Sequence, residues 1–158
     1  MSKAAEDGNS RAFQFPRALG GESGGLNFSF SGVKTAVRYA VCGPQQTDFS
    51  SVHLSQQQIA DLAASFQEAV VDSLVTKARL AIEQTGERTL CVGGGVAANR
   101  RLRERLAEMA IEMRVEVHIA PPDLCTDNAV MGAIAFERLR AGKTESLELE
   151  AYPGLVRA

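Results

Sequence analysis

The chain has 158 residues, of which 45% are apolar, and a formal net charge of -2. A chain of this size buries roughly 70% of its unfolded surface, so we expect residues 1–158 to form a single domain with a real core. The charge balance gives no sign of a general nucleic-acid binder, and any RNA contact must come from a local basic patch. No apolar run approaches the ~20 residues of a membrane span and no signal core opens the chain, which predicts a soluble cytoplasmic protein. Cys42, Cys91 and Cys125 are odd in number and far apart, which favours reduced thiols.

The first part of the chain predicts loops followed by a short helix. Residues 1–27 mix charged residues with Gly and Ser, and the run 20–25 indicates a mobile loop. After a short extended piece at residues 28–30, Ser31 is predicted to cap a helix. Its apolar stripe comprises Val33, Ala36, Val37 and Ala40. Lys34 lies in the first turn, where a cation opposes the helix dipole by about 0.3–1 kcal/mol, so it either has an anionic partner or extends into water.

A long helix is predicted after the loop that begins at Cys42. Residues 55–58, Ser-Gln-Gln-Gln, form a capping-box pattern, and Gly86 is placed to end the helix. Apolar residues recur between them at steps of three and four, which predicts a core-facing stripe. The stripe comprises Ile59, Leu62, Ala63, Phe66, Val70, Leu74, Ala78, Ala81 and Ile82.

The centre of the chain predicts a parallel β-α-β unit around three glycines. An apolar strand from Thr89 runs into residues 93–95, all glycine, and leaves as a helix with Leu102, Leu106, Met109 and Ala110 on its buried face. Val115, Val117 and Ile119 then alternate with polar residues in a second strand. A glycine turn at a helix start suits phosphate, and ligands of such sheets bind beyond the carboxyl ends of the strands. A tight turn with no ligand explains the glycines equally well.

Two polar features follow from this unit. Arg100, Arg101, Arg103 and Arg105 place cations at a helix start, so they meet either an anion or the glutamates of the same helix, Glu104, Glu108 and Glu112. Asp127 lies between the second strand and a last helix that closes at Gly142, where it could cap that helix or bind a metal ion. Residues 143–158 form an acidic tail without useful periodicity.

Three stretches, in the same order along the chain, resemble motifs of the tRNA N6-adenosine threonylcarbamoyltransferases, the TsaD family. They are Phe28-Ser-Phe-Ser-Gly-Val-Lys-Thr35, Gly94-Gly-Val-Ala-Ala-Asn99-Arg-Arg-Leu-Arg103 and Leu124-Cys-Thr-Asp-Asn128. The resemblance covers only the later part of a family member. Gly93, Val33, Val130 and Gly132 depart from the usual residues beside the motifs.

The resemblance implies an α/β fold that is part of the second lobe of an actin-like (ASKHA, RNase H-like) protein. We expect a helix-rich chain with a short parallel β-α-β unit, without the three-stranded start of the lobe's sheet. The chain also lacks the glycine-rich motifs of the first lobe and the two helical histidines of the family's metal site. No complete catalytic constellation is therefore expected in this chain, and its activity alone is expected to be small.

The implied function is tRNA modification, in which an acyltransferase moves a threonylcarbamoyl group from threonylcarbamoyl adenylate to N6 of the adenosine next to the anticodon. The resemblance assigns Asn99, with Gly94 and Gly95, to nucleotide binding, and Asp127 to a divalent metal ion, iron or alternatively zinc. Asn99 could also cap a helix, a role that can coexist with binding. Lys34, Arg100 and Arg101 are candidates for tRNA or phosphate contacts. TsaB-like and TsaE-like proteins are the implied partners. The alternative is a non-catalytic nucleotide- or partner-binding module of the same superfamily; a sugar or acid kinase lobe is disfavoured because the three motifs match the transferases better.

Overall fold

The longest element of the computed structural model is α3, which spans Gln56–Thr85. Its first turn is closed by the predicted capping box, because the Ser55 hydroxyl accepts from the Gln58 N–H and the Gln58 side chain accepts from the Ser55 N–H. At its other end Gly86 adopts a left-handed conformation with φ of 71°. Both predicted ends of this helix are confirmed. They could be predicted because local sequence alone specifies them.

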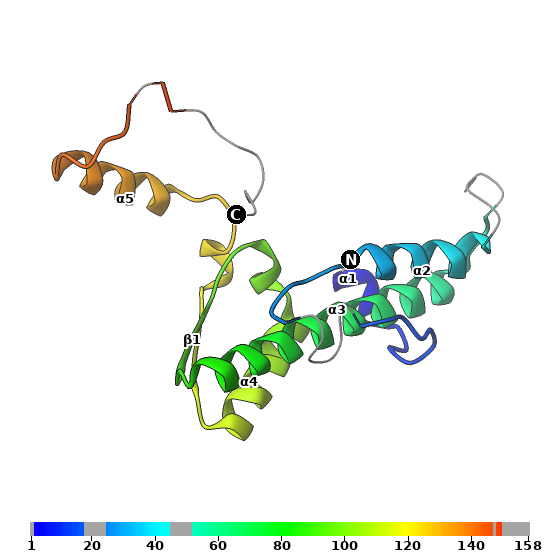
Figure 1. The fold of residues 1–158 in the computed structure, drawn as a ribbon. Coiled ribbons are helices and arrows are strands. Elements are labelled where there is room, and N and C mark those ends of the chain that lie inside the picture. The colour runs from blue at the N-terminus through cyan, green and yellow to red at the C-terminus, as the bar shows by residue number, and fades with distance from the viewer. Residues whose placement is uncertain (1, 18–24, 45–51, 147, 150–158) are drawn as a thin grey trace. The chain divides into compact units, whose positions relative to one another are not determined.

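The structure describes residues 2–17, 25–44, 52–146 and 148–149, and divides into two compact units, Met1–Cys125 and Thr126–Ala158 (Figure 1). In the first unit the order is α1 (Ser2–Ala5), α2 (Ser31–Cys42), α3, β1 (Thr89–Val92), the 3-10 helix η2 (Gly95–Ala98), α4 (Arg100–Met113), β2 (Glu116–Ile119) and the 3-10 helix η3 (Pro122–Leu124). In the second unit α5 spans Ala129–Arg140. The expected helix-rich chain with a short parallel sheet is therefore observed.

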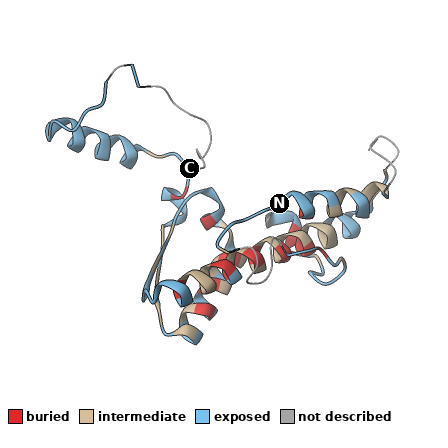
Figure 2. Ribbon diagram, viewed as in Figure 1, coloured by how far each residue is buried: buried red, intermediate tan, exposed pale blue. Residues whose placement is uncertain are grey.

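The predicted parallel β-α-β unit is confirmed. β1 pairs with β2 in parallel, with Thr89 opposite Glu116 and Val92 opposite Ile119, and α4 connects the two strands. Its core joins α3, α4 and the inner face of the sheet through Val71, Val75, Ile82, Leu102, Leu106 and Met109. Figure 2 shows these buried residues gathered along α3 and α4. The packed core of α3 and α4 therefore supports both strands up to their carboxyl ends.

The buried face of α3 differs from the predicted one. Of the predicted stripe only Ile82 is fully buried, whereas Ala64, Ser65, Ala69, Val71, Ser73, Val75 and Lys77 are buried instead. The reason is that contacts with α1, α2 and α4 bury other residues of this helix, whereas the middle of the predicted stripe borders an open apolar groove. Phe66, Val70, Leu74 and Ala78 stay at intermediate burial.

The N-terminal segment packs on α3 rather than forming loops alone. The short helix α1 contacts α3, and a Cβ added at Gly8 would lie 2.0 Å from the carbonyl oxygen of Ala60. Phe15, Val33 and Ala69 form a second small core. The predicted cap at Ser31 is wrong, because Ser31 is already the first helical residue and the capping position is Phe30, which offers no side-chain acceptor. The predicted mobile loop lies mostly outside the described residues.

In the second unit, the predicted helix is confirmed as α5. Every residue from Ala129 to Arg140 is exposed. Most of the predicted tail, residues 147 and 150–158, lies outside the described residues. Cys42, Cys91 and Cys125 are free thiols, as expected. Among the described residues, no helix combines the length and apolar character that crossing a membrane requires.

Candidate functional site

The glycine turn follows directly from β1. Gly94 has φ of 89°, a conformation that a side chain rarely adopts, whereas Gly93 and Gly95 have no such requirement. The predicted helix follows the glycines, although not directly. A single 3-10 turn, η2, intervenes, in which the Ala97 N–H donates to the Gly94 carbonyl at 2.9 Å. The amino end of α4 therefore lies at residue 99, four residues beyond the last glycine.

Asn99 begins α4 and is held on two sides. Its Oδ1 accepts from the Leu102 N–H at 3.0 Å, which makes it the N-cap, and its Nδ2 donates to Oε1 of Gln67 at 2.8 Å. The predicted helix cap at Asn99 is therefore present. Because α3 and α4 both hold this amide, it is presented in one orientation at the edge of the glycine turn. Gln67 could not be found from local sequence, since it lies 32 residues away on α3.

The arginine run of α4 is compensated mainly by α3. Arg101 makes two contacts with Glu68, at 2.8 and 2.9 Å, and Arg105 contacts Glu68 at 2.9 Å and Asp72 at 2.8 Å. The hydrogen bonds from Arg101 outweigh burial and lower the pKa of Glu68 below its usual value, and Glu68 in turn raises the pKa of Arg101. An internal network therefore accounts for the charge of Arg101 and Arg105 without RNA.

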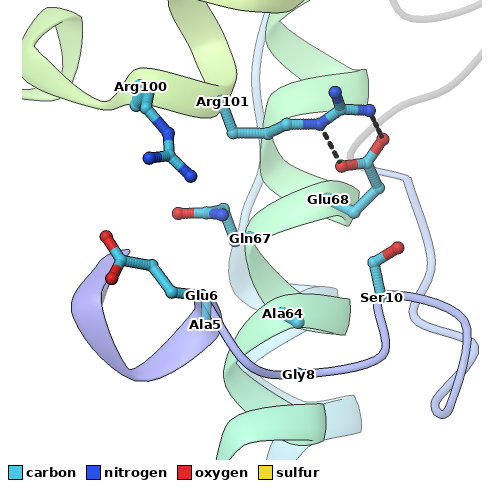
Figure 3. A pocket seen from close by; sticks show the side chains of 9 residues that line it. All are labelled: Ala5, Glu6, Gly8, Ser10, Ala64, Gln67, Glu68, Arg100 and Arg101. Carbon is cyan, nitrogen blue, oxygen red and sulfur yellow. Dashed lines mark hydrogen bonds and ion pairs between the residues drawn. The ribbon is translucent and has the colours of Figure 1, made fainter.

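A polar hollow of about 200 Å³ lies beside this network in the first unit. Figure 3 shows Arg100 and Arg101 of α4, Gln67 and Glu68 of α3, and the segment around Gly8 bordering it. Arg100 is 78% exposed and its only ion pair within the described chain is with Glu104, at 3.5 Å. Sequence reasoning selected Arg100 and Arg101 but missed Gln67 and Glu68, because nothing in the local pattern distinguishes them on a long amphipathic helix.

An apolar groove of about 520 Å³ lies on another side of the same unit. It is lined by Phe66, Val70, Leu74, Leu90, Val92 and Leu106, with Lys34 also at its wall. Lys34 is exposed. The groove follows β1, which pairs with β2 on one edge only within the described residues. Part of the predicted core stripe of α3 therefore faces a groove.

Asp127 belongs to the second unit and is exposed. It does not cap α5, because the side chain of Asn128 accepts from the Val130 N–H at 3.0 Å and holds that position. The capping alternative for Asp127 is therefore wrong. Within the part of the chain that the structure describes, no three His, Cys, Asp or Glu side chains gather as a possible metal site.

The comparison with known protein families matches residues 1–134 to TsaD, the tRNA N6-adenosine threonylcarbamoyltransferase family. The chain belongs to the TsaD family. A curated TsaD protein from Rhodopirellula baltica, named tRNA N6-adenosine threonylcarbamoyltransferase, is 49% identical over 166 residues. That match covers 99% of this chain and 46% of the relative, so the chain spans about half the length of the TsaD protein it matches.

The structure brings some of the expected site residues together. Gly94, Gly95 and Asn99 lie in succession between β1 and α4, and Arg100 and Arg101 follow on the first turn of α4. Asp127 lies in the other unit and is described by itself. One side of a candidate nucleotide site is thus assembled within the first unit.

Proposed function

We propose that this chain supplies part of a TsaD-type transferase, which moves a threonylcarbamoyl group from threonylcarbamoyl adenylate to N6 of the adenosine next to the tRNA anticodon. In that reaction the N6 amine nitrogen bonds to the activated carbonyl carbon, the bond from that carbon to the phosphate oxygen breaks, and adenosine monophosphate leaves while the amine gives up a proton. The observation that carries the proposal is the amide of Asn99, held between Leu102 and Gln67 at the end of the glycine turn.

The contribution of the first unit is binding and orientation of the nucleotide. The exposed turn at Gly94 and Gly95 lets a ligand approach the backbone, because no Cβ projects from it. The amide of Asn99 is both donor and acceptor, which suits a ribose hydroxyl or a base edge. Lys34 and Arg100 are exposed cations that could meet tRNA or substrate phosphate, whereas Arg101 would first have to leave Glu68.

Asp127 is proposed as one ligand of a divalent metal ion, iron or zinc. Its exposed carboxylate is a suitable oxygen ligand, but one side chain does not make a divalent site, since such sites need three or more ligands. The described residues alone therefore do not fit the ion, and we assign no step of the transfer to it. The two missing ligands would be histidines from a part of the family polypeptide that this chain does not span.

The fold of the first unit is proposed to be the incomplete second lobe of an actin-like protein. The apolar groove beside β1 supports this, because a parallel sheet is normally covered on both faces and extended by further strands. Its volume of about 520 Å³ would admit several apolar side chains. We further propose that the chain acts on tRNA in the cytoplasm, together with TsaB-like and TsaE-like partner proteins.

The test uses two substitutions at Asn99 that separate capping from binding. Asn99→Ala removes both, so it should cost about 1 kcal/mol of stability and weaken threonylcarbamoyl adenylate binding by about five- to a hundredfold. Asn99→Ser keeps a good N-cap but loses the amide, so it should retain stability and still lose affinity.

Calorimetric titration with threonylcarbamoyl adenylate measures the affinity, and thermal unfolding measures stability. Asn128→Ser, which changes the cap of α5 in the same way, is the matched control and should leave affinity unchanged. A wild-type chain that does not bind the adenylate, or an Asn99→Ser protein that binds it normally, contradicts the proposal. Binding that never leads to turnover, even with the rest of a TsaD protein supplied, would favour the non-catalytic module instead.

A further inference from the structure

Arg103 differs from the other arginines at the start of α4. Arg100 pairs with Glu104, Arg101 with Glu68, and Arg105 with Glu68 and Asp72. Arg103 has no carboxylate partner among the residues that the structure describes. Its guanidinium group instead contacts the loop that follows β2.

The guanidinium of Arg103 meets neutral acceptors. Its Nη2 donates to the carbonyl of Ala120 and to Sγ of Cys125, the latter at 3.4 Å. Cys125 is only 3% exposed, and its own thiol donates to the same carbonyl at 3.4 Å. The Nε of Arg103 is buried and has no hydrogen-bond partner within the described chain.

This arrangement costs more free energy than a contact that only fills space would require. A buried donor without an acceptor costs about 1–3 kcal/mol, and an apolar side chain of similar length could cover the loop without that cost. Unsatisfied buried polar atoms therefore call for a reason beyond stability. The structure points to that reason through the three segments that the guanidinium joins.

Two of these segments border the glycine turn. The Arg103 N–H donates to the carbonyl of Asn99 at 3.2 Å, so Arg103 lies one helical turn from this candidate nucleotide-binding residue. The Ala120 N–H donates to the carbonyl of Val92 at 2.9 Å, directly before the glycines. Cys125 ends the first unit, two residues before Asp127.

We propose that Arg103 is a positioning residue that holds the end of β2 and the Cys125 loop against the first turn of α4, and thereby keeps the glycine turn beside Asn99 in its binding arrangement. The meaning of the contact for binding rests on the proposed function, whereas the contact itself does not.

The contact is tested by the reactivity of the three thiols in the full chain. Cys91 is exposed and serves as the internal reference, and Cys125 is buried behind Arg103. In the wild type, iodoacetamide should modify Cys125 at least about a hundredfold more slowly than Cys91. Arg103→Leu should raise the Cys125 rate by about tenfold or more, and Arg103→Lys should restore most of the protection, because lysine can donate to both acceptors.

Arg105→Leu is the matched control, since it breaks ion pairs on the same helix but makes no contact with the loop. It should lower the melting temperature and leave Cys125 protected. If the Arg103→Leu protein does not fold, Arg103→Gln, which keeps a neutral donor, provides the same comparison. A Cys125 that stays protected in both uncharged variants overturns the proposal.

The second measurement is calorimetric affinity for threonylcarbamoyl adenylate. Arg103→Leu should weaken it by about fivefold or more, with recovery in Arg103→Lys, because the end of β2, which bonds to Val92 directly before the glycine turn, is then no longer held in place. Unchanged affinity together with a freed Cys125 overturns the positioning role. A wild-type chain that does not bind the adenylate contradicts the proposed function, while the thiol rates still decide whether Arg103 holds the loop.

Discussion

Neutralising Glu68 should destabilise the first unit more than its place on a helix surface indicates. Its carboxylate accepts from Arg101 at 2.8 and 2.9 Å and from Arg105 at 2.9 Å, and its side chain is only 16% exposed. A hydrogen bond to a charged group contributes about 1.5–3 kcal/mol, and the partial exposure of both arginines reduces this. For Glu68→Gln we expect a loss of about 2 kcal/mol, or roughly 4–8 °C in melting temperature for a chain of this length.

The effect of Glu68→Gln should depend on pH. The arginines hold the pKa of Glu68 below its usual value of 4.5, so the ionised carboxylate contributes its stability above that value. The contribution falls as the pH drops through the lowered pKa of the folded state. The difference between wild type and Glu68→Gln should therefore be full at pH 7 and shrink progressively below pH ~4.5.

Thermal unfolding followed by circular dichroism at several pH values measures this difference. Glu112→Gln is the control, because Glu112 pairs with Arg79 while its side chain is 61% exposed, and such a pair contributes about 0–1 kcal/mol. Equal losses in the two variants at pH 7, or a loss at Glu68 that does not change with pH, would refute the reasoning.

Three further predictions concern the steric room at one glycine, the backbone conformation at another and the candidate metal ligand. Gly8→Ala should cost about 1–3 kcal/mol in chemical unfolding, because the new Cβ would collide with a carbonyl of α3, whereas Gly32→Ala, with open space in α2, should be neutral or stabilising. Gly94→Ala should cost about 1–3 kcal/mol through its φ of 89°, and Gly95→Ala should change stability little; equal effects would contradict the strain argument. In a longer family protein that includes this chain and the two histidines, Asp127→Ala should remove the bound metal, measured by elemental analysis, and the transferase activity, while circular dichroism stays unchanged; a full equivalent of metal would disprove the assignment.

Local sequence was sufficient where neighbouring residues make the decisive contacts. The capping box at Ser55 and the left-handed Gly86 are each satisfied within a few residues, so both ends of α3 were predictable. The same holds for the cap at Asn99, which bonds to Leu102 three residues later. Hydrophobic spacing was enough to predict α4 and its two flanking strands.

Local sequence failed to place the starts of α2 and α5 to the exact residue. Ser31 and Asp127 both have good capping side chains, but α2 begins at Ser31 itself and Asn128 holds the cap of α5. A shift of one residue decides which side chain reaches the free N–H groups, and the packing of the whole helix sets that shift. The buried face of α3 was missed because it depends on the contacts with three other helices, which leave part of the predicted stripe lining an apolar groove.

The sequence by itself determined the longer helices, the two strands, their order and the family, because these depend on residue spacing and on ordered motifs that do not need the fold. The tertiary structure alone decided what each polar side chain does. Glu68 lies 33 residues from Arg101, and Cys125 lies 22 residues from Arg103, so no local pattern connects them. Side-chain charges find partners only after the helices pack, and that packing separates the compensated Arg101 from Arg103, which has no carboxylate partner within the described chain.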